Sequence, residues 1–256
     1  MLPILNLGPL AIQTPGLILL IGVWIGLTQA EKFARFLKID SDHIYSLSLL
    51  TMVAGIFGAR LSFAAQNPAA FQNNWTGLFS LTLQMMDIFG GGVVGLLAAF
   101  IYGQRKGLPF WKTLDVFTPG FAVLAIAFGF AQLSSGDAFG APANLPWSIH
   151  LWGEWRHPSQ IYFILSAGLI ALLVWPRSGS QFNPSGVRFL IWIGSSALAR
   201  IFLETFRGDS PILIDSLRSS QITAWLILAG ALVLLNRRLT HNNILPEAQT
   251  PQSTPK

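Results

Sequence analysis

The sequence contains no cysteine, and its only histidines are His43, His150, His157 and His241. Without cysteine the chain cannot form disulfides, thiolate metal sites or a cysteine nucleophile. No two of the histidines have the spacing of metal ligands. We therefore expect no metal centre.

Charged residues are also scarce. They make up 11% of the 256 residues, against about 25% in soluble domains, whereas hydrophobic residues make up 52% and the mean hydropathy is +0.54. This composition indicates an integral membrane protein with little room for a sizeable soluble domain. The net charge of +5 comes from basic residues scattered through loops, without a basic stripe interleaved with aromatics, which excludes nucleic acid as a partner.

Apolar runs long enough to cross a membrane recur seven times. They cover residues 15–36, 44–65, 89–103, 111–133, 160–175, 187–206 and 221–235. We therefore predict an all-α bundle of about seven transmembrane helices. The first span is expected to stay in the mature protein, because no Lys or Arg precedes Lys32 and the run is too long for a signal-peptide core. Residues 1–240 form one transmembrane domain in this interpretation, and the Pro/Thr/Gln-rich tail 241–256 is predicted to be a disordered cytoplasmic segment.

The basic residues give the bundle an orientation. Eleven of the sixteen lie on one side of the predicted membrane: Lys32, Arg35, Lys38, Arg105, Lys106, Lys112, Arg177, Arg188, Arg237, Arg238 and Lys256. The positive-inside rule makes this side cytoplasmic, which places the N-terminus outside and the C-terminus inside. The longest loop, residues 134–157, is then outside. Because it is rich in Gly, Pro and Trp, we expect it to pack over the mouth of the bundle.

One face of the sixth span carries charge. Arg200, Glu204 and Arg207 are separated by four and three residues, which places them on one side of a helix. An arginine at the centre of a membrane helix costs about 2.5–3.5 kcal/mol on insertion scales, so such charges pair. They mark either a functional site or a structural Arg–Glu clasp between helices. At about 1.5 Å per residue, Arg200 lies roughly 10 Å below the outer end of its span, near the depth of outer-leaflet phosphates.

Four other motifs lie at this outer level, and each allows two interpretations. Arg60, after two small residues, either anchors its helix at the interface or binds an anionic head group. The glycines at 90–92 allow close helix packing or expose backbone to a ligand. Asp137, between glycines, belongs to an ordinary turn or sits beside a head group. The segment 156–162 is a good helix cap, with Ser159 and Gln160 satisfying free amides, or part of a site.

Taken together and in this order, these motifs resemble the prolipoprotein diacylglyceryl transferase family. The resemblance rests on Gly58-Ala59-Arg60-Leu61, Gly90-Gly91-Gly92, Ser135-Gly136-Asp137 with Gly140, His157-Pro158-Ser159-Gln160-Ile161-Tyr162, the Arg200, Glu204 and Arg207 series, and Ser219-Ser220-Gln221. These motifs span most of the chain.

The resemblance implies a seven-helix enzyme of the bacterial cytoplasmic (inner) membrane that uses no soluble cofactor. Such an enzyme moves the diacylglyceryl group of phosphatidylglycerol onto the lipobox cysteine thiol of a preprolipoprotein and releases glycerol phosphate. Its implied partners are phosphatidylglycerol or another anionic phospholipid, the preprolipoprotein signal peptide and membrane lipid. The residues expected to bind phospholipid are Arg60, Arg200, Glu204, Arg207, Gly91, Gly92, Gly140, Gln160 and Tyr162. His157 and Asp137 are the candidate catalytic bases.

The sequence also departs from the family pattern. Gly90 stands where a histidine usually precedes a glycine pair, and Gly129 and Gln132 stand where arginine and asparagine are expected. The further departures are Asp137 in place of glutamate, Pro15 in place of tyrosine and Phe163 in place of glutamate. Two hypotheses follow: a diverged diacylglyceryl transferase, or a non-catalytic paralogue that binds anionic phospholipid or a lipoprotein precursor. A small transporter has no support, because no interrupted helices recur in matching halves.

Overall fold

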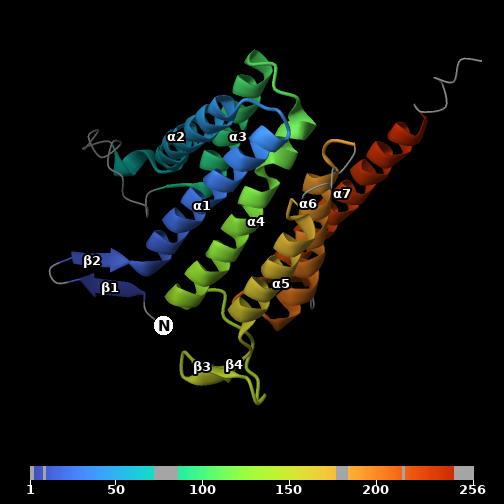
Figure 1. Cartoon of the computed structure of the whole chain (residues 1–256). Helices are drawn as coiled ribbons and strands as arrows, with labels where there is room; N and C mark the ends of the chain where they lie inside the picture. Colours follow the sequence, from blue (N-terminus) through green and yellow to red (C-terminus); the bar gives the residue numbers. More distant parts are fainter. Residues whose placement is uncertain (1–2, 8–9, 72–85, 177–183, 215–216, 245–256) are drawn as a thin grey trace, which may run out of the picture. The chain divides into compact units, whose positions relative to one another are not determined.

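Helices dominate the computed structural model, which describes residues 3–7, 10–71, 86–176, 184–214 and 217–244. The α-helices in this part of the chain are α1 (Thr14–Phe36), α2 (Ser41–Gln66), α3 (Ile88–Arg105), α4 (Phe110–Ser135), α5 (Ser159–Val174), α6 (Val187–Leu203) and α7 (Ser219–Ile244) (Figure 1). Each coincides with one of the predicted apolar runs.

Six helical segments are long and apolar enough to cross a membrane, with α6 counted through the 3-10 turn that follows it to Phe206. The exception is α5, which is apolar but has only 16 residues, or about 24 Å at 1.5 Å per residue. The prediction of a helical multi-pass membrane protein is confirmed. That all seven helices cross the membrane stays a prediction.

Short elements that we did not predict join the helices. Two are single 3-10 turns, η1 (Pro68–Ala70) and η4 (Glu204–Phe206). The others form three antiparallel hairpins, which pair β1 (Ile4–Leu7) with β2 (Leu10–Gln13), β3 (Ile149–Leu151) with β4 (Glu154–Arg156), and β5 (Ile212–Ile214) with β6 (Leu217–Arg218). Strands of two to four residues are too short for an alternating pattern to show in the sequence.

The last helix is longer than its apolar run. Although the run ends at residue 235, α7 continues to Ile244 and includes the first residues of the predicted tail. The remainder of that tail, 245–256, lies outside the described residues, as does Arg177 of the topological count.

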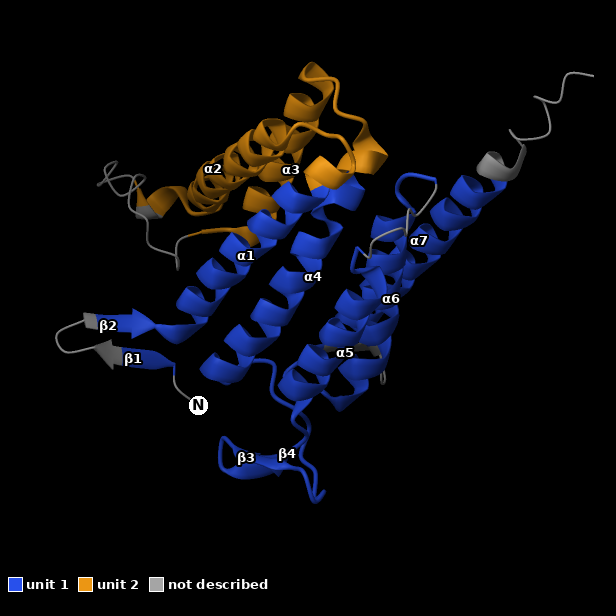
Figure 2. Cartoon of the chain, in the orientation of Figure 1, with its two compact units in different colours: residues 1–33, 114–256 blue, residues 34–113 orange. Residues whose placement is uncertain are grey.

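The chain divides into two compact units (Figure 2). The smaller unit, residues 34–113, contains α2 and α3, which pack closely through glycines. A Cβ atom added at Gly91 would lie 2.8 Å from the carbonyl oxygen of Gly55. Asp87 caps α3 and binds the end of α2, because its carboxylate accepts hydrogen bonds from Ser62 (2.6 Å) and Gln66 (2.9 Å). The Ser62 hydrogen bond is the main reason that the pKa of Asp87 lies below its usual value.

The larger unit, residues 1–33 and 114–256, holds the other helices. Small residues again set the distances: a Cβ atom at Gly26 of α1 would lie 3.0 Å from the carbonyl oxygen of Gly120 in α4. The core between α4, α5 and α6 is built on buried Ala122, Ala171 and Val174. Close helix packing through small residues is the usual arrangement in membrane bundles.

A buried carboxylate fixes the first turn of α6. The Asp115 carboxylate of α4 accepts hydrogen bonds from the amides of Gly186 (2.5 Å) and Phe189 (2.9 Å). The Arg188 side chain, 2% exposed, donates to the carbonyl oxygen of Val174 at 2.5 Å and lies over the Phe33 ring. Our placement of Arg188 in a loop is therefore wrong. Arg188 is the second residue of α6. The sequence shows that this position is charged, but it does not show whether the side chain points into the protein or toward solvent.

Candidate functional site

Three chain segments meet beside the ends of α4, α5 and α6 in the larger unit. The loop after α4 (139–142) lies between the entry to α5 (156–157) and the turn after α6 (206–208), and backbone hydrogen bonds join it to both. Ala141 donates to the carbonyl oxygen of Phe206 (2.8 Å) and accepts from the amide of His157 (3.0 Å). We call these three segments the backbone platform. It fixes the residues that precede and follow the three helices.

Gly140 lies at the centre of the backbone platform. A Cβ atom added there would overlap the carbonyl oxygen of His157, and one added at Gly208 would lie 2.7 Å from the carbonyl oxygen of Gly140. Neither neighbour is the flexible end of a side chain. The structure therefore requires glycine at position 140 for the approach of backbone to backbone.

We expect Gly140→Ala to destabilise the protein by about 1–3 kcal/mol, the range for overpacking, because two backbone segments must separate. Thermal unfolding of the purified protein in detergent measures this effect. The matched control is Gly92→Ala in α3, where an added Cβ atom would meet nothing within 4 Å. Equal melting temperatures for the two variants would contradict the role assigned to Gly140.

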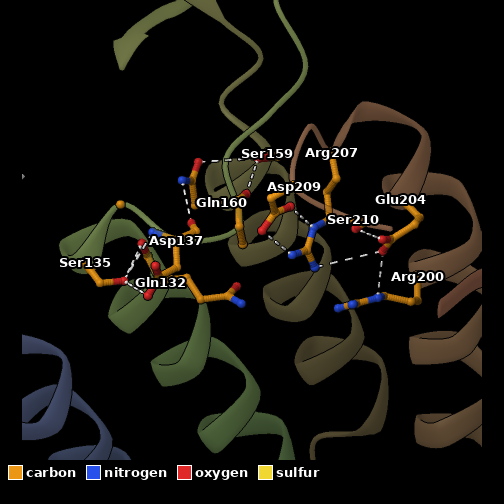
Figure 3. Close-up of polar contacts among 12 residues, drawn as sticks. Gln132, Ser135, Asp137, Ser159, Gln160, Arg200, Glu204, Arg207, Asp209 and Ser210 are labelled. Atoms are coloured by element: carbon orange, nitrogen blue, oxygen red, sulfur yellow. Dashed lines mark hydrogen bonds and ion pairs between the residues drawn. The ribbon is translucent and has the colours of Figure 1, made fainter. Parts of the chain in front are cut away.

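Beside the backbone platform, the charges of the sixth span form a connected cluster (Figure 3). Helix α6 ends at Leu203 and tightens into η4, whose first residue, Glu204, is fully buried. The Oε2 atom of Glu204 lies 2.9 Å from Nε of Arg200 and 4.0 Å from Nη1 of Arg207. Its Oε1 atom accepts a short hydrogen bond from the Ser210 hydroxyl. The predicted proximity of the three charges is confirmed.

The same contacts test the alternative that these charges form a structural Arg–Glu clasp between helices. Both ion pairs of Glu204 join residues of one continuous segment, 200–207, so they do not form a clasp between helices. Burying the Glu204 carboxylate without a partner would be costly, and the two arginines offset that cost.

Arg207 is held on its other side by Asp209. Its Nε and Nη2 atoms donate to the two carboxylate oxygens of Asp209 at 2.9 and 2.8 Å. Partial burial disfavours the charge on both groups, but the paired hydrogen bonds outweigh it, so the pKa of Asp209 is lowered and that of Arg207 is raised. All three guanidinium nitrogens of Arg207 therefore face carboxylates of the protein itself.

Among the described residues, the guanidinium group of Arg200 binds the protein through one atom only, Nε, which faces Glu204. Its Nη1 and Nη2 atoms form an unshared edge, because no side chain or backbone group in the described part of the chain bonds them. The side chain is 36% exposed. In Figure 3 the side chains of Arg200 and Gln132 point toward one another from α6 and α4. A guanidinium edge of this kind can bind a carboxylate or phosphate through two hydrogen bonds.

The loop that carries Asp137 is tied to the start of α5. Asp137 lies in a turn where its carboxylate accepts from the Ser135 hydroxyl at 2.7 Å. The Ser159 hydroxyl donates to the carbonyl oxygen of Ala138 (2.6 Å), and the fully buried Gln160 amide donates to that of Asp137 (2.8 Å). Our interpretation of Ser159 and Gln160 as helix caps is therefore wrong. Their side chains satisfy loop carbonyls, not the free amides of α5.

Aromatic residues adjoin this loop. The His157 ring packs against Phe206, with ring centres 5.2 Å apart, and its Nδ1 atom lies 3.5 Å from the Tyr162 hydroxyl. That hydroxyl accepts a hydrogen bond from the indole of Trp147 at 2.8 Å. The structure thus brings His157 and Tyr162 together, beside the turn that contains Arg207.

Three residues of the predicted site belong to the smaller unit. Arg60 is buried, with its guanidinium 5.5 Å from the centre of the Phe71 ring. Gly91 is packed against α2, as described above, whereas the position of a Cβ atom at Gly92 is open. That these three residues share a site with Arg200 stays a prediction.

At Gly90 and Gly129, two departures from the family pattern, neighbouring side chains fill the space beside the glycine. A Cβ atom at Gly90 would overlap Ser62, and one at Gly129 would lie 2.6 Å from Ile164 and 2.9 Å from the Phe163 ring. The expected histidine and arginine would therefore collide with their present neighbours. Substitution at Gly90 or Gly129 alone cannot rebuild the usual site without movement of these side chains.

Sequence reasoning assigned no role to Asp115, Asp209 or Ser210, and placed Trp147 only in an aromatic belt near the predicted helix ends. Asp209 and Ser210 follow Arg207 within three residues, and their nearness was the available signal, because short polar side chains bond charged groups a few residues away. The hydrogen bonds of Trp147 and Asp115 gave no such signal, since their partners are distant in sequence. No group of three or more potential metal ligands occurs among the described residues.

Long apolar helices and a buried ionic cluster beside their ends define a multi-pass membrane protein with a charged site. A sequence profile described as prolipoprotein diacylglyceryl transferase matches residues 3–237. The chain belongs to the prolipoprotein diacylglyceryl transferase family.

Curated relatives agree with this assignment. The chain is 30% identical over 259 residues to the phosphatidylglycerol–prolipoprotein diacylglyceryl transferase of Thermosynechococcus vestitus, covering 96% of each protein. Proteins of the same name from Nostoc sp. and Clostridioides difficile are 27% and 25% identical, over 96% and 85% of this chain and 93% and 87% of their own lengths.

Proposed function

We propose that this protein transfers the diacylglyceryl group of phosphatidylglycerol to the lipobox cysteine thiol of a prolipoprotein. The observation that carries the proposal is the family match over nearly the whole chain, residues 3–237. The buried cluster around Glu204 supports it, because a lipid phosphate requires fixed positive charge beside the membrane helices.

The proposed setting is the bacterial cytoplasmic (inner) membrane. In this arrangement all seven helices cross the bilayer, with the N-terminus outside and the C-terminus in the cytoplasm. Of the basic residues that support this orientation, Lys32, Arg35, Lys38, Arg105 and Lys106 lie near the ends of α1 and α3. The proposed partners are phosphatidylglycerol, the signal peptide of the preprolipoprotein and the surrounding lipid.

Arg200 is the proposed phosphate ligand. Its Nη1 and Nη2 edge is the unshared part of the cluster, and Glu204 holds its Nε atom at 2.9 Å. Arg207, engaged by Asp209 and Glu204, maintains the turn and does not contact the lipid directly. Arg60 supplies a second positive charge in the proposal. Gln160, Tyr162 and Gly140 position the loop and the backbone platform, and Gly91 and Gly92 line the lipid path.

The proposed reaction forms one bond and breaks one. The cysteine sulfur attacks the glyceryl carbon that carries the phosphate, and a thioether forms as the carbon–oxygen bond breaks. The electron pair of that bond leaves on glycerol phosphate, next to Arg200, and the thiol proton goes to a base. His157 and Asp137 are the candidate bases. Stabilising the charge on the departing phosphate is the largest contribution expected from the protein.

A second function is favoured by the packing at Gly90 and Gly129. Since Ser62, Ile164 and Phe163 occupy the space that a histidine and an arginine would need, the chain can be a paralogue that binds anionic phospholipid or a lipoprotein precursor without transfer. In this alternative the Arg200 edge still holds a phosphate.

Transfer of labelled diacylglyceryl from phosphatidylglycerol to a lipobox peptide distinguishes the two functions. The transferase proposal predicts a thiol-linked product with the pure wild-type protein. The comparison variant is Gly90→His/Ser62→Gly/Gly129→Arg/Phe163→Glu/Ile164→Ala, which adds the missing groups together with space and a counter-charge. A product from this variant alone would establish the binding function and reject the transferase.

A further inference from the structure

The β3–β4 hairpin exposes a set of tryptophans. Trp147, Trp152 and Trp155 are 59%, 66% and 55% exposed, although they lie within nine residues of one another. Our expectation that the loop 134–157 packs over the bundle mouth accounts for none of this exposed apolar surface. Large exposed apolar surface of this kind marks an interaction site.

The hairpin has two different faces. Strand β3 pairs with β4 so that His150 lies opposite Trp155 and Leu151 lies opposite Glu154. Because side chains alternate along a strand, His150 and Trp155 share the outer face, and buried Leu151 lies on the inner one. Trp152 is at the turn, where it and Gly153 both have positive φ (56° and 84°). Trp155 therefore points away from the inner side of the hairpin, with Trp152 beside it at the turn and Trp147 just before β3.

Two of these tryptophans are held at the level of the helix ends. The indole of Trp152 donates to the carbonyl oxygen of Gly136, the first residue after α4, at 3.2 Å. The indole of Trp147 donates to Tyr162, in the first turn of α5, at 2.8 Å. Both polar N–H groups are thus satisfied within the protein, which leaves ring carbons as the exposed surface.

Apolar side chains near the neighbouring helix ends are exposed as well. Phe128 and Phe130 near the end of α4, and Ile161 and Leu165 at the start of α5, are exposed, as expected for lipid-facing side chains. The hairpin carries little net charge, because Glu154 pairs with Arg156 at 2.6 Å. A neutral, apolar surface beside the ends of membrane helices fits the boundary between head groups and acyl chains.

We propose that the exposed tryptophans in and next to the β3–β4 hairpin, Trp147, Trp152 and Trp155, dock into the head-group–acyl boundary of the bilayer. This contact holds the loop that carries Asp137 and His157 at the membrane surface. It does not depend on the transfer reaction, and it requires no anionic lipid, since the hairpin is neutral.

The absence of cysteine makes the test direct, because one introduced cysteine takes a fluorescent label uniquely. We would label His150→Cys on the outer face and, as the matched control, Glu154→Cys on the inner face. Each full-length protein is reconstituted in phosphatidylcholine nanodiscs with lipid brominated near the carbonyl end of the chain. We expect several-fold stronger quenching by brominated lipid at position 150 than at position 154. We also expect this quenching to fall to the control level in a Trp152→Ala/Trp155→Ala background.

Two outcomes would overturn the proposal. The first is equal, weak lipid quenching at both positions, with equal access to aqueous iodide. The second is a label at position 150 that is insensitive to the lipid but is shielded from iodide by an added lipobox peptide. That result would make the acceptor peptide the occupant of this face. Melting temperatures near that of the wild type confirm that each labelled variant is folded.

Discussion

Replacing Arg200 with glutamine is expected to lower diacylglyceryl transfer by about 100- to 1,000-fold. This is the usual loss when one group that stabilises a developing anion is removed. In the proposed mechanism the unshared guanidinium edge of Arg200 faces the departing phosphate, while Glu204 fixes its orientation at 2.9 Å. Arg200→Lys keeps the charge but loses the paired hydrogen bonds, so we expect an intermediate rate.

The matched control is Arg105→Gln at the end of α3, which removes the same charge from an exposed position outside the proposed site. We expect this variant to keep the wild-type rate. The measurement is the initial rate of transfer to a lipobox peptide, at equal amounts of folded protein. If both variants lost transfer rate to a similar extent, the rate would depend on the net charge of the protein and not on the particular edge of Arg200.

Replacing Asp115 with alanine is expected to lower the stability by about 2–6 kcal/mol, because two largely buried backbone amides each lose their acceptor at about 1–3 kcal/mol. The change removes the acceptor for the amides of Gly186 and Phe189, and with it the negative charge that stabilises the buried Arg188 side chain. The effect comes from packing at the start of α6, so it requires no contact with lipid.

Asp40→Ala is the matched control, because Asp40 also caps a helix but is exposed and accepts only from the amide of Asp42. Loss of such a cap costs about 1 kcal/mol. Thermal unfolding in detergent compares the two. We also expect Asp115→Ala/Arg188→Met to recover part of the loss, since it also removes the buried positive charge that the Asp115 carboxylate stabilises. No recovery in the double variant would show that Asp115 contributes only through the helix cap.

The sequence predicted the helices well, because the bilayer demands long uninterrupted apolar runs. Each of the seven runs corresponds to a helix, and the largest error in an end is at α7, where the polar residues after 235 continue the helix. The hairpins were missed for the opposite reason. Strands β3 and β4 have three residues each, and their pairing depends on the turn at Trp152 and Gly153, which lacks the usual Asn-Gly or Asp-Gly signal.

The ionic cluster could be predicted because its members are close in sequence. The spacing of Arg200, Glu204 and Arg207 fixes their proximity on a helix, and the tightening at η4 changes it little. Arg188 and Gln160 were misinterpreted because their partners come from other helices and loops. Sequence spacing cannot show that Gln160 would reach the carbonyl oxygen of Asp137, or that Arg188 would turn inward against Phe33.

The central claim is that the free edge of Arg200 holds the phosphate of an anionic phospholipid. Native mass spectrometry of the protein, released from detergent after incubation with phosphatidylglycerol, tests this claim by counting bound lipid. We predict one retained phosphatidylglycerol for the wild type and for Arg105→Gln, and none for Arg200→Gln. Equal retention by Arg200→Gln would contradict the claim.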